Sequence, residues 1–438
     1  MRPVSGAPKS TMPSTSIAER QAGEPPTSKT RRVGIVGPGL MGLGIAQAVA
    51  ASGSRVLLCG RNADAARAGR RRLEDAIERQ VARGRLERAV GVGVLANVQA
   101  AEDDNALGGC EIVIESVDED REAKTQVLRR IEAAAPRGTL IASNTSGLAI
   151  SGLARTLEDP ARFLGLHFFS PAERMALVEV VRGDQTSETY VQAALAFVAE
   201  IGKRPVLVRD GPGFFATRVF AAYLDEALAM VSEGVAPQSI EDAATANGRA
   251  LGPLAMLDET GLLLSLQQAR QARADGLAPR FCRPLAEPVL SRMAEFGRGG
   301  RRNGGGFFDW PAEGPQTAWP GLEGAFPIVA RQPEIPDVKL RLLCAEAREA
   351  LRCLEEGVIA SADDGDAASV LGLGFPKRVG GILRWAEDFG LTAFVATCDA
   401  LARDEGERFA PSPWLRDVAE RGEGLASWRP GVKRRSEA

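Results

Sequence analysis

The stretch of sequence that decides the fold is RVGIVGPGLMG, at residues 32–42. Val33 to Val36 form a short apolar run, which is typical of a buried parallel strand. The glycines after this run match the pattern G-x-G-x-x-G, and a helical pattern follows from about Met41 to Ser52. In that setting the first glycine allows a tight turn, the second lets the backbone approach a pyrophosphate, and the third allows close packing of helix on strand. Because the first N–H groups of the helix would face the phosphates, we predict a dinucleotide-binding turn formed by Gly37, Gly39, Leu40, Met41 and Gly42.

Further apolar runs and helical stretches alternate after this turn. Helices are expected between several of the runs, including Arg121 to Ala134 and Thr189 to Ile201. Such alternation is typical of a Rossmann-like, doubly wound parallel sheet, which we place over residues 31–208 as an NAD(P)-binding domain. The additional expected strands are Arg55 to Cys59, Glu111 to Glu115, Thr139 to Ala142, Phe163 to His167, Leu177 to Val181 and Pro205 to Val208.

Beyond Asp210 the pattern changes to longer amphipathic helices that contain an internal repeat. Glu226-Ala227-Leu228 recurs 123 positions later as Glu349-Ala350-Leu351, and Glu233-Gly234-Val235 recurs as Glu356-Gly357-Val358. Downstream, Asp242-Ala243 corresponds to Asp366-Ala367, and Gly252-Pro253 corresponds loosely to Phe375-Pro376. Matches in the same order indicate two duplicated all-α helical domains. We place them at 209–310 and 337–438, joined by a linker at 311–336 that is rich in Pro and Gly.

Composition excludes several classes of function. The chain has 438 residues and a formal net charge of −3, so no basic field argues for nucleic acid as a partner. The sequence contains no stretch of about 18 apolar residues, so a membrane span is not expected. Residues 1–30 are rich in Pro, Ser, Thr and Gly, lack the apolar centre of a secretory signal, and are expected to be a disordered extension. Six cysteines without a Cys-x-x-Cys pair, together with a single histidine, predict free thiols in a reducing cytoplasm and no metal site.

The end of the second strand bears on the choice of cofactor. An acidic residue commonly accepts hydrogen bonds from the NAD ribose about 20 positions after the glycine turn. Here the sequence reads Cys59-Gly60-Arg61-Asn62, without a carboxylate. A small residue followed by Arg61 leaves room for a 2′-phosphate and offers a guanidinium to bind it. The sequence therefore favours NADP or dual use, although Arg61 could instead be merely solvated while NAD binds without its ribose carboxylate.

The only histidine, His167, is the candidate acid/base. Histidine exchanges protons near neutral pH, but a lone histidine beside aromatic residues is usually a core residue. Glu179 lies within the apolar run Leu177 to Val181, where a buried carboxylate needs a partner. A carboxylate that orients an imidazole and stabilises its charged form is a common catalytic pairing. Ser143 to Ser146 follow another strand and add hydroxyl and amide groups at the same edge of the sheet.

At these positions the chain resembles the L-3-hydroxyacyl-CoA dehydrogenase family. The resemblance extends from about residue 31 to 310, and the second helical copy is similar to the matching part of bacterial multifunctional fatty-oxidation proteins. We expect a stand-alone form without the hydratase/isomerase domain of those proteins. The matching segments are Gly37 to Gly42, Val113-Ile114-Glu115 with Glu119 and Lys124, Ser143 to Ser146, His167-Phe168-Phe169, Leu177 to Val180, Pro212 to Phe215 with Arg218, Leu251-Gly252-Pro253, and Gly304 to Phe307.

The resemblance implies the reaction and the role of each residue. His167 would take the proton from a 3-hydroxyl group while a hydride passes from C3 to the nicotinamide of NAD or NADP, or the reverse. Glu179 would orient His167, and Ser146 would hydrogen-bond the substrate oxygen close to the cofactor. Glu119 and Lys124 would lie along the cofactor. Arg302 would replace a lysine that reaches the cofactor from the helical domain. The substrate would be an acyl-CoA or acyl-carrier thioester of fatty-acid or related acyl metabolism.

Three departures from the family pattern stand at Gly60, Ser170 and Thr217. The family usually has aspartate in place of Gly60, which supports the NADP hypothesis. It usually has asparagine in place of Ser170, expected beside the cofactor, and of Thr217, expected in the catalytic group. A hydroxyl cannot supply the paired donor and acceptor of an amide. The sequence thus predicts a reshaped or slower active site, tuned to an unusual acyl chain.

Two other functions stay open from the sequence. One is a non-catalytic NAD(P)-binding scaffold, which the two missing asparagines favour and the joint presence of His167, Glu179 and Ser146 disfavours. The other is a β-hydroxyacid dehydrogenase, which would need a catalytic lysine in the helical region, where lysines are scarce beyond residue 203. A substrate carried on acyl carrier protein, or one from specialised metabolism, is a further alternative. Because the second helical copy could cover the surface through which short family members pair, we expect a monomer, with a dimer as the alternative.

Overall fold

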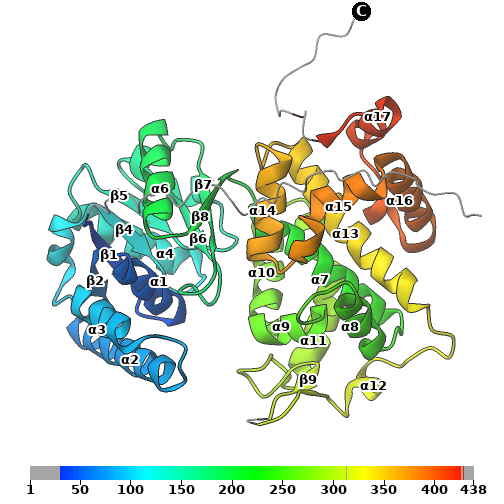
Figure 1. The fold of residues 1–438 in the computed structure, drawn as a ribbon, viewed down its shortest axis with the longest axis horizontal. Helices are drawn as coiled ribbons and strands as arrows, with labels where there is room; N and C mark the ends of the chain where they lie inside the picture. Colours follow the sequence, from blue (N-terminus) through cyan, green and yellow to red (C-terminus); the bar gives the residue numbers. More distant parts are fainter. Residues whose placement is uncertain (1–29, 312, 426–427, 429–438) are drawn as a thin grey trace, which may run out of the picture.

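The computed structural model describes residues 30–311, 313–425 and 428. An α/β domain lies beside a larger helical region, and the two are joined after the last strand of the sheet (Figure 1). The expected disordered extension, apart from residue 30, and the last ten residues of the expected second helical domain lie outside the described residues.

The α/β domain is built on an eight-stranded sheet of order β3-β2-β1-β4-β5-β6-β7-β8. Neighbouring strands run parallel except β6 and β7, which are antiparallel. The sheet is mostly parallel, as the doubly wound pattern predicts, and β6 and β7 differ because residues 169–176 are too few for the crossover that parallel strands need. The strands are β1 (Arg32–Val36), β2 (Arg55–Cys59), β3 (Val98–Ala100), β4 (Ile112–Glu115), β5 (Leu140–Ser143), β6 (Phe163–Phe168), β7 (Leu177–Arg182) and β8 (Arg204–Arg209).

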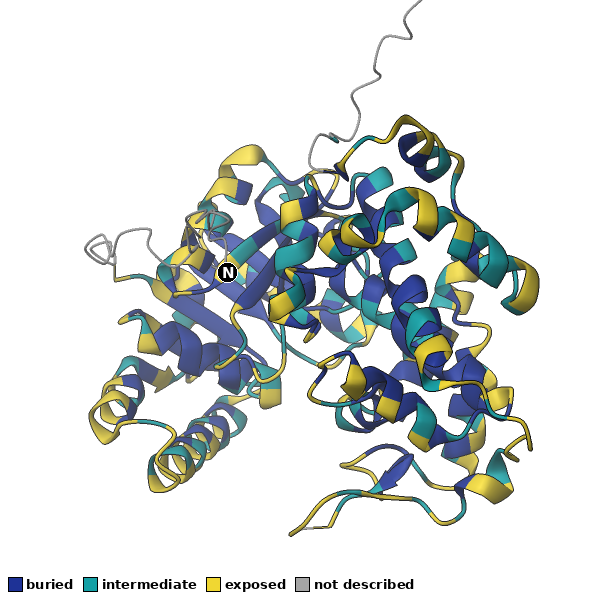
Figure 2. Cartoon of the chain, turned by 45° about the vertical axis from the view of Figure 1, so that its right-hand side comes forward, coloured by how far each residue is buried: buried dark blue, intermediate teal, exposed yellow. Residues whose placement is uncertain are grey.

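Two layers of helices cover the sheet, and its inner strands are buried on both faces (Figure 2). One hydrophobic cluster joins Val33 and Ile35 of β1 to four helices, while Val36 belongs to the cluster on the opposite face. This alternation is the period of two expected for a strand. The first layer contains α1 (Leu40–Ala51), α2 (Ala63–Ala82), α3 (Arg88–Asn97) and α6 (Glu188–Glu200), and the opposite layer contains α4 (Arg121–Ala134) and α5 (Ile150–Ala154).

The helical region contains two successive groups of helices. In the second group, α14 lies against β7 and β8, so this group covers part of the sheet (Figure 1). The segment expected to be a linker forms a short antiparallel pair, β9 (Phe308–Asp309) with β10 (Thr317–Ala318), and the short helix α12 (Leu322–Ala325). The first group is α7 (Ala216–Ser232), α8 (Pro237–Ala246), α9 (Pro253–Thr260), α10 (Leu262–Ala274) and α11 (Ala286–Glu295); the second is α13 (Ile335–Glu355), α14 (Ala362–Gly372), α15 (Ile382–Phe389), α16 (Leu391–Glu405) and α17 (Pro413–Arg421).

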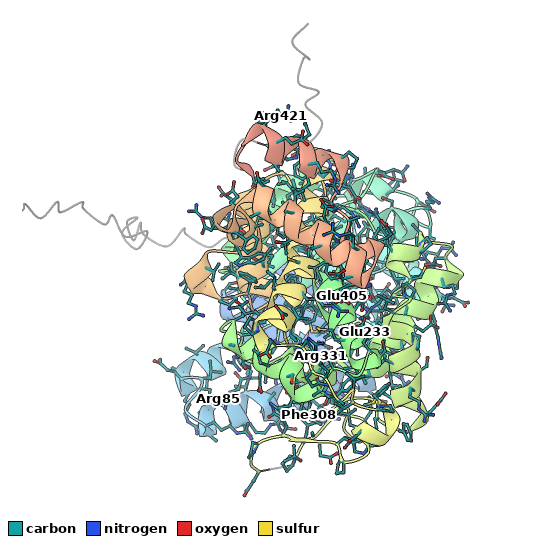
Figure 3. The ribbon with its side chains drawn as sticks, turned by 90° about the vertical axis from the view of Figure 1, so that its right-hand side faces the viewer. Arg85, Glu233, Phe308, Arg331, Glu405 and Arg421 are labelled. Carbon is teal, nitrogen blue, oxygen red and sulfur yellow. The ribbon has the colours of Figure 1, made fainter. Side chains whose placement is uncertain are left out.

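Helices α7 and α13 pack together through reciprocal ion pairs. Arg218 Nε lies 2.5 Å from Glu349 Oε1, and Arg341 Nε lies 2.5 Å from Glu226 Oε1. Each residue of one pair stands 123 positions from its counterpart in the other pair. Reciprocal contacts of this kind are the signature of a two-fold interface, here formed within one chain. Arg341 also contacts Glu405, and Figure 3 shows Glu405 above Glu233, a further partner of Arg341, on the helical side of the molecule.

The repeated units also share a carboxylate that binds the start of a helix, buried at Glu241 and partly buried at Asp366. Glu241 accepts a hydrogen bond from Leu254 N in α9, and Asp366 accepts from Leu383 N in α15, each at 2.8 Å. Asp242, which the sequence comparison aligned with Asp366, is instead exposed and hydrogen-bonded to Gln238. The sequence alignment of the repeats was therefore one residue out of step at this point.

The buried carboxyl of Glu241 gives a test of stability against pH. Burial raises its pKa from 4.5 to about 7, so the folded chain keeps a proton that the unfolded chain has already lost. The free energy of unfolding should therefore fall as the pH rises from about 4.5 to about 7. Glutamine carries no charge at either pH. The free energy of unfolding of Glu241→Gln, relative to that of the wild type, should therefore rise by on the order of 1–2 kcal/mol between pH 5 and pH 7.5.

Chemical denaturation at these two pH values measures the effect. Asp242→Asn is the matched control, because Asp242 is adjacent to Glu241 but its carboxyl is exposed. The pH dependence of its free energy of unfolding should equal that of the wild type. An unchanged pH dependence in Glu241→Gln would show that Glu241 is already ionised in the folded chain.

Candidate active site

The glycine turn between β1 and α1 has the geometry of a pyrophosphate site. A Cβ at Gly37, whose φ is 110°, would strike the carbonyl of Ser116, and one at Gly42 would strike the carbonyl of Gly37. At Gly39, by contrast, a Cβ would meet nothing within 4 Å. Gly39 is also the N-cap of α1 and provides no side chain to bond its first N–H groups. The turn is therefore closed where helix and strand must pack and open where a phosphate would approach.

Steric crowding explains the missing carboxylate at the end of β2. A Cβ at Gly60 would lie 2.7 Å from Ala66 N, in the backbone of α2, so an aspartate would require the helix to shift. Arg61 is exposed at this corner. Asn62 accepts a hydrogen bond of 2.9 Å from Ala65 N and starts α2. Within the described part of the chain Arg61 forms no ion pair, so an exposed guanidinium follows the end of β2, where the adenine ribose of a dinucleotide would lie.

His167 and Glu179 form a buried pair across β6 and β7. The two residues are directly opposite each other in the antiparallel register, so their side chains share one face of the sheet. His167 Nδ1 lies 2.7 Å from Glu179 Oε2. The Phe169 ring lies 4.5 Å from the imidazole, centroid to centroid, and restricts its rotation. Because a carboxylate accepts, it selects the tautomer with hydrogen on Nδ1 and leaves Nε2 available to substrate.

The start of α7 holds the other oxygen of this carboxylate. Glu179 Oε1 accepts hydrogen bonds from Phe215 N at 3.2 Å and Ala216 N at 2.9 Å. Gly213 and Phe214 both adopt positive φ, which bends the chain into the helix at this point. The two amides fix the orientation of the carboxylate that faces His167. They were missed from the sequence, although the Pro212-Gly213 turn before an apolar helix was a signal for a helix start.

Glu119 and Lys124 organise the loop that carries Ser146. Glu119 Oε1 accepts from Thr145 Oγ1 at 2.6 Å, Ser146 N at 2.9 Å and Gly147 N at 3.1 Å. Lys124 is only 1% exposed, and its ammonium lies near Glu115, Glu119 and the carbonyl of Val117, at 2.9, 3.4 and 3.2 Å. Two of these contacts, with Glu115 and with the carbonyl of Val117, are hydrogen bonds, and the third is an ion pair with Glu119.

A hydrogen bond also connects the ends of strands β5 and β6 beside the site. Asn144 Oδ1 accepts a hydrogen bond of 2.8 Å from Phe168 N, next to His167. This bond fixes the end of β5 against the end of β6. The sequence placed an amide at this edge of the sheet but did not identify its partner, since the bond depends on the spacing of the two strands.

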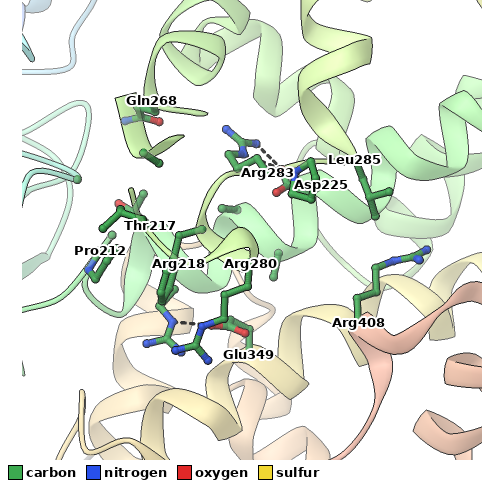
Figure 4. Close-up of a pocket in the computed structure, with 18 of the residues that line it drawn as sticks. Pro212, Thr217, Arg218, Asp225, Gln268, Arg280, Arg283, Leu285, Glu349 and Arg408 are labelled. Atoms are coloured by element: carbon green, nitrogen blue, oxygen red, sulfur yellow. Dashed lines mark hydrogen bonds and ion pairs between the residues drawn. The ribbon is translucent and has the colours of Figure 1, made fainter. Parts of the chain in front are cut away.

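A cavity of about 590 Å³ opens beside these groups, between the α/β domain and the helical region. Glu119, Leu148 and Thr217 are among its lining residues. Figure 4 shows Thr217 at the start of α7 close to Arg218, which is paired with Glu349 of α13. Thr217 directly follows Ala216, whose amide binds Glu179. The structure thus brings together most of the residues expected in the site. Ser170 is exposed beyond β6, and Arg302 is exposed in the loop before β9.

The arrangement combines a proton-transfer pair with a nucleotide turn. β1 and β6 run in the same direction within the sheet, so the ends that carry Gly37 and His167 point to one edge. Ligands of open α/β sheets bind at that edge. An imidazole that can take up a proton beside a bound nicotinamide has the chemistry of an alcohol dehydrogenase.

Family models and solved structures agree with this geometry. Residues 32–211 match the NAD binding domain of 3-hydroxyacyl-CoA dehydrogenase, and residues 213–310 and 338–427 match the C-terminal domain of that family. A 3-hydroxybutyryl-CoA dehydrogenase from Escherichia coli K12 is 26% identical, with a TM-score of 0.75 over 90% of this chain and 98% of that chain.

Two further structures span different parts of the molecule. The (S)-3-hydroxybutyryl-CoA dehydrogenase of Ralstonia eutropha is 33% identical and covers 64% of this chain and 98% of its own, with a TM-score of 0.59. The dehydrogenase part of multifunctional enzyme 1 from C. elegans is 25% identical and covers 89% of each chain, with a TM-score of 0.63. The chain belongs to the 3-hydroxyacyl-CoA dehydrogenase family and is an oxidoreductase with an NAD-binding Rossmann domain.

Proposed function

We propose that this chain interconverts (S)-3-hydroxyacyl and 3-oxoacyl thioesters, with His167 as the catalytic acid/base. The observation that carries the proposal is the 2.7 Å contact between His167 and Glu179 at the edge of a dinucleotide-binding sheet. The nicotinamide, when bound, accepts or supplies the hydride at C3. His167 removes the proton of the 3-hydroxyl through Nε2, and Glu179 stabilises the imidazolium that results.

The surrounding residues position the substrate and the catalytic pair. The Ser146 hydroxyl donates a hydrogen bond to the substrate oxygen, and Thr217 borders the acyl chain at the start of α7. Glu119 and Lys124 act as positioning residues, since their bonds hold the loop around Ser146. Gly37, Gly39, Leu40, Met41 and Gly42 bind the pyrophosphate, and Ser170 and Arg302 border the cofactor from outside the sheet.

The substrate class is proposed from the named relatives. Two of them are 3-hydroxybutyryl-CoA dehydrogenases, so we take a coenzyme A thioester as the substrate rather than an acyl-carrier-protein thioester. A panel of 3-oxoacyl thioesters, varied in chain length and carrier, assayed with NADH and NADPH, tests this. We expect nucleotide oxidation with at least one coenzyme A thioester. No oxidation with any thioester would leave a nucleotide-binding scaffold as the function.

The open corner at Gly60 leads us to propose that NADP is also used, with Arg61 binding its 2′-phosphate. Arg61→Ala should then raise the KM for NADPH roughly tenfold, the usual size of a lost charge-assisted hydrogen bond, and leave the KM for NADH unchanged. Arg67→Ala is the matched control on the same surface, because Arg67 is paired with Asp64 and Glu102. A strong wild-type preference for NADH would contradict the role of Arg61.

We further propose the domain division 31–208, 209–310 and 337–438, joined by 311–336. In this division the reciprocal ion pairs between α7 and α13 join the two helical domains, and they support a monomer. We place the protein in the cytoplasm. None of the helices in the described part of the chain combines the length and the apolar character needed to cross a membrane.

A further inference from the structure

The catalytic pair lies on a face of the sheet that the second helical copy partly covers. Leu177 and Glu179 are two positions apart in β7, so their side chains share this face, and His167 lies opposite Glu179 in the register. Helix α14 of the second copy packs against β7, β8 and α7. One hydrophobic cluster joins Leu177 of the sheet and Phe215 at the start of α7 with Ala368 of α14. The second copy therefore reaches the surroundings of the pair.

The segment between α13 and α14 is fixed to the edge of the sheet. Ile359 forms an antiparallel bridge with Val208 of β8. The adjacent residues add a second contact, since Arg209 N donates a hydrogen bond of 2.8 Å to the carbonyl oxygen of Val358. Backbone bonds of this kind do not depend on the rotation of side chains. The start of α14, only a few residues later, is therefore held close to β8.

Two glycines let α14 approach the side chains that border the pair. A Cβ added at Gly372 would lie 2.6 Å from Leu177 Cδ2 and 3.3 Å from Phe169 Cε1. A Cβ added at Gly365 would lie 2.7 Å from two neighbouring side chains and 3.5 Å from Phe215 Cζ. The two glycines are about two helical turns apart, so they lie on one face of α14. This face is the one that packs against the sheet and the start of α7.

The two aromatic residues that meet these glycines also contact the catalytic pair. The ring of Phe169 lies 4.5 Å from the imidazole of His167, centroid to centroid. The backbone N–H of Phe215 donates a hydrogen bond of 3.2 Å to Glu179 Oε1. One glycine of α14 therefore reaches the acid/base and the other reaches the residue that orients it, each through a single aromatic residue.

The internal repeat shows that the glycines of α14 are a departure. The counterpart of α14 in the first copy is α8, since Glu241 of α8 and Asp366 of α14 each bind the start of a following helix. Helix α8 contains no glycine. Gly365 lies in the interior of α14, where glycine lowers helix stability relative to alanine. Gly372 does not adopt the positive φ that would itself require glycine. Close approach to the sheet is therefore what these positions require.

We propose that the second helical copy positions the catalytic pair, with Gly372 and Gly365 of α14 as positioning residues that act through Phe169 and Phe215. The inference rests on the proposed function and adds a structural requirement to it. An aromatic contact and a backbone hydrogen bond fix the pair only if the groups that provide them are themselves held in place. A displacement of about 1 Å can lower turnover about 100-fold, even when the substitution that causes it is far from the reacting atoms.

Gly372→Ala tests the contact nearest to the acid/base. Because Leu177 is fully buried and Phe169 only partly buried, the added methyl should displace the ring of Phe169. We expect kcat with a 3-oxoacyl thioester to fall roughly tenfold, since the displacement is smaller than 1 Å. The KM for the nucleotide should stay unchanged, because the glycine turn lies on another strand.

The single histidine provides a second readout that needs no substrate. In a chain without a histidine tag, isotope labelling at histidine Cε1 gives one imidazole signal in the NMR spectrum, that of His167. The chemical shift of this signal depends on the position of the Phe169 ring. We therefore expect the signal to move in Gly372→Ala, whereas a loss of stability alone would leave it in place.

Two further variants separate the contact from general effects of substitution. Leu177→Val removes one carbon for the one that alanine adds, so Gly372→Ala combined with Leu177→Val should regain most of the wild-type kcat and chemical shift. Gly93→Ala is the matched control, because a Cβ at this position of α3 would meet nothing within 4 Å, and it should behave as the wild type. Phe169→Leu removes the ring itself and should also lower kcat and move the signal.

The outcomes distinguish this inference from the proposed function. Wild-type kcat in Gly372→Ala, or in Phe169→Leu if Gly372→Ala does not fold, would overturn the inference and leave the proposed function intact. A lower kcat with an unmoved imidazole signal would also overturn it, because the effect would not pass through His167. A wild-type chain that reduces no 3-oxoacyl thioester would instead overturn the proposed function, while the imidazole signal still tests the contact with α14.

Discussion

His167→Gln is expected to lower kcat by roughly 10²-fold to 10⁴-fold, which is the usual contribution of a general acid or base. Glutamine can still hydrogen-bond Glu179, but it cannot exchange a proton at the position of Nε2. The chain has no second histidine to take over this role. The nucleotide turn lies on a different strand, so nucleotide binding should stay unchanged. Steady-state kinetics with a 3-oxoacyl thioester and fluorescence titration with the reduced nucleotide measure the two effects.

Glu179→Gln separates the acid/base from the residue that orients it. The amide should keep much of the geometry but stabilise the imidazolium poorly, so kcat should fall with nucleotide affinity intact. Retention of more than about a tenth of the wild-type kcat in His167→Gln would contradict acid/base catalysis by this residue.

The second large effect concerns stability, at the buried pair between Arg249 and Glu346. Their side chains are 2% and 0% exposed, with Arg249 Nη2 2.5 Å from Glu346 Oε2. Arg249 also lies over the ring of Tyr223, 4.3 Å from its centroid. Because Glu346→Ala leaves an uncompensated buried cation, the free energy of unfolding should fall by about 3–5 kcal/mol. Chemical denaturation near neutral pH measures the loss.

A double variant distinguishes the charge from the packing. Arg249→Met with Glu346→Leu removes both charges and should recover most of the lost stability. Arg384→Ala breaks an exposed pair and should change the free energy of unfolding by less than about 1 kcal/mol. A similarly small loss in Glu346→Ala would show that Arg249 finds another partner or water.

The nucleotide turn could be predicted from sequence residue by residue, because the need for glycine at each position depends on contacts with nearby backbone. The closed positions at Gly37 and Gly42 and the open one at Gly39 follow the roles that the pattern indicates. The antiparallel course of β7 was missed although the short connection at 169–176 predicts it. The edge strand β3 has only three residues and left little periodic signal.

The site itself was only partly predictable. His167 and Glu179 could be paired, since a buried carboxylate in a strand requires a cation or donor nearby. The amides of Phe215 and Ala216 could not be predicted, because their bonds to Glu179 depend on how the helical region packs on the sheet.

The most direct test follows the hydride. A 3-oxoacyl thioester is reduced with nicotinamide nucleotide that carries deuterium at both hydrogen positions of C4, and mass spectrometry locates the label in the product. Hydride transfer to C3 beside His167 predicts one deuterium at C3 of the (S)-3-hydroxyacyl thioester for each nucleotide oxidised. Nucleotide oxidation without deuterium at C3, or no oxidation with any 3-oxoacyl thioester, would contradict the proposed dehydrogenase reaction.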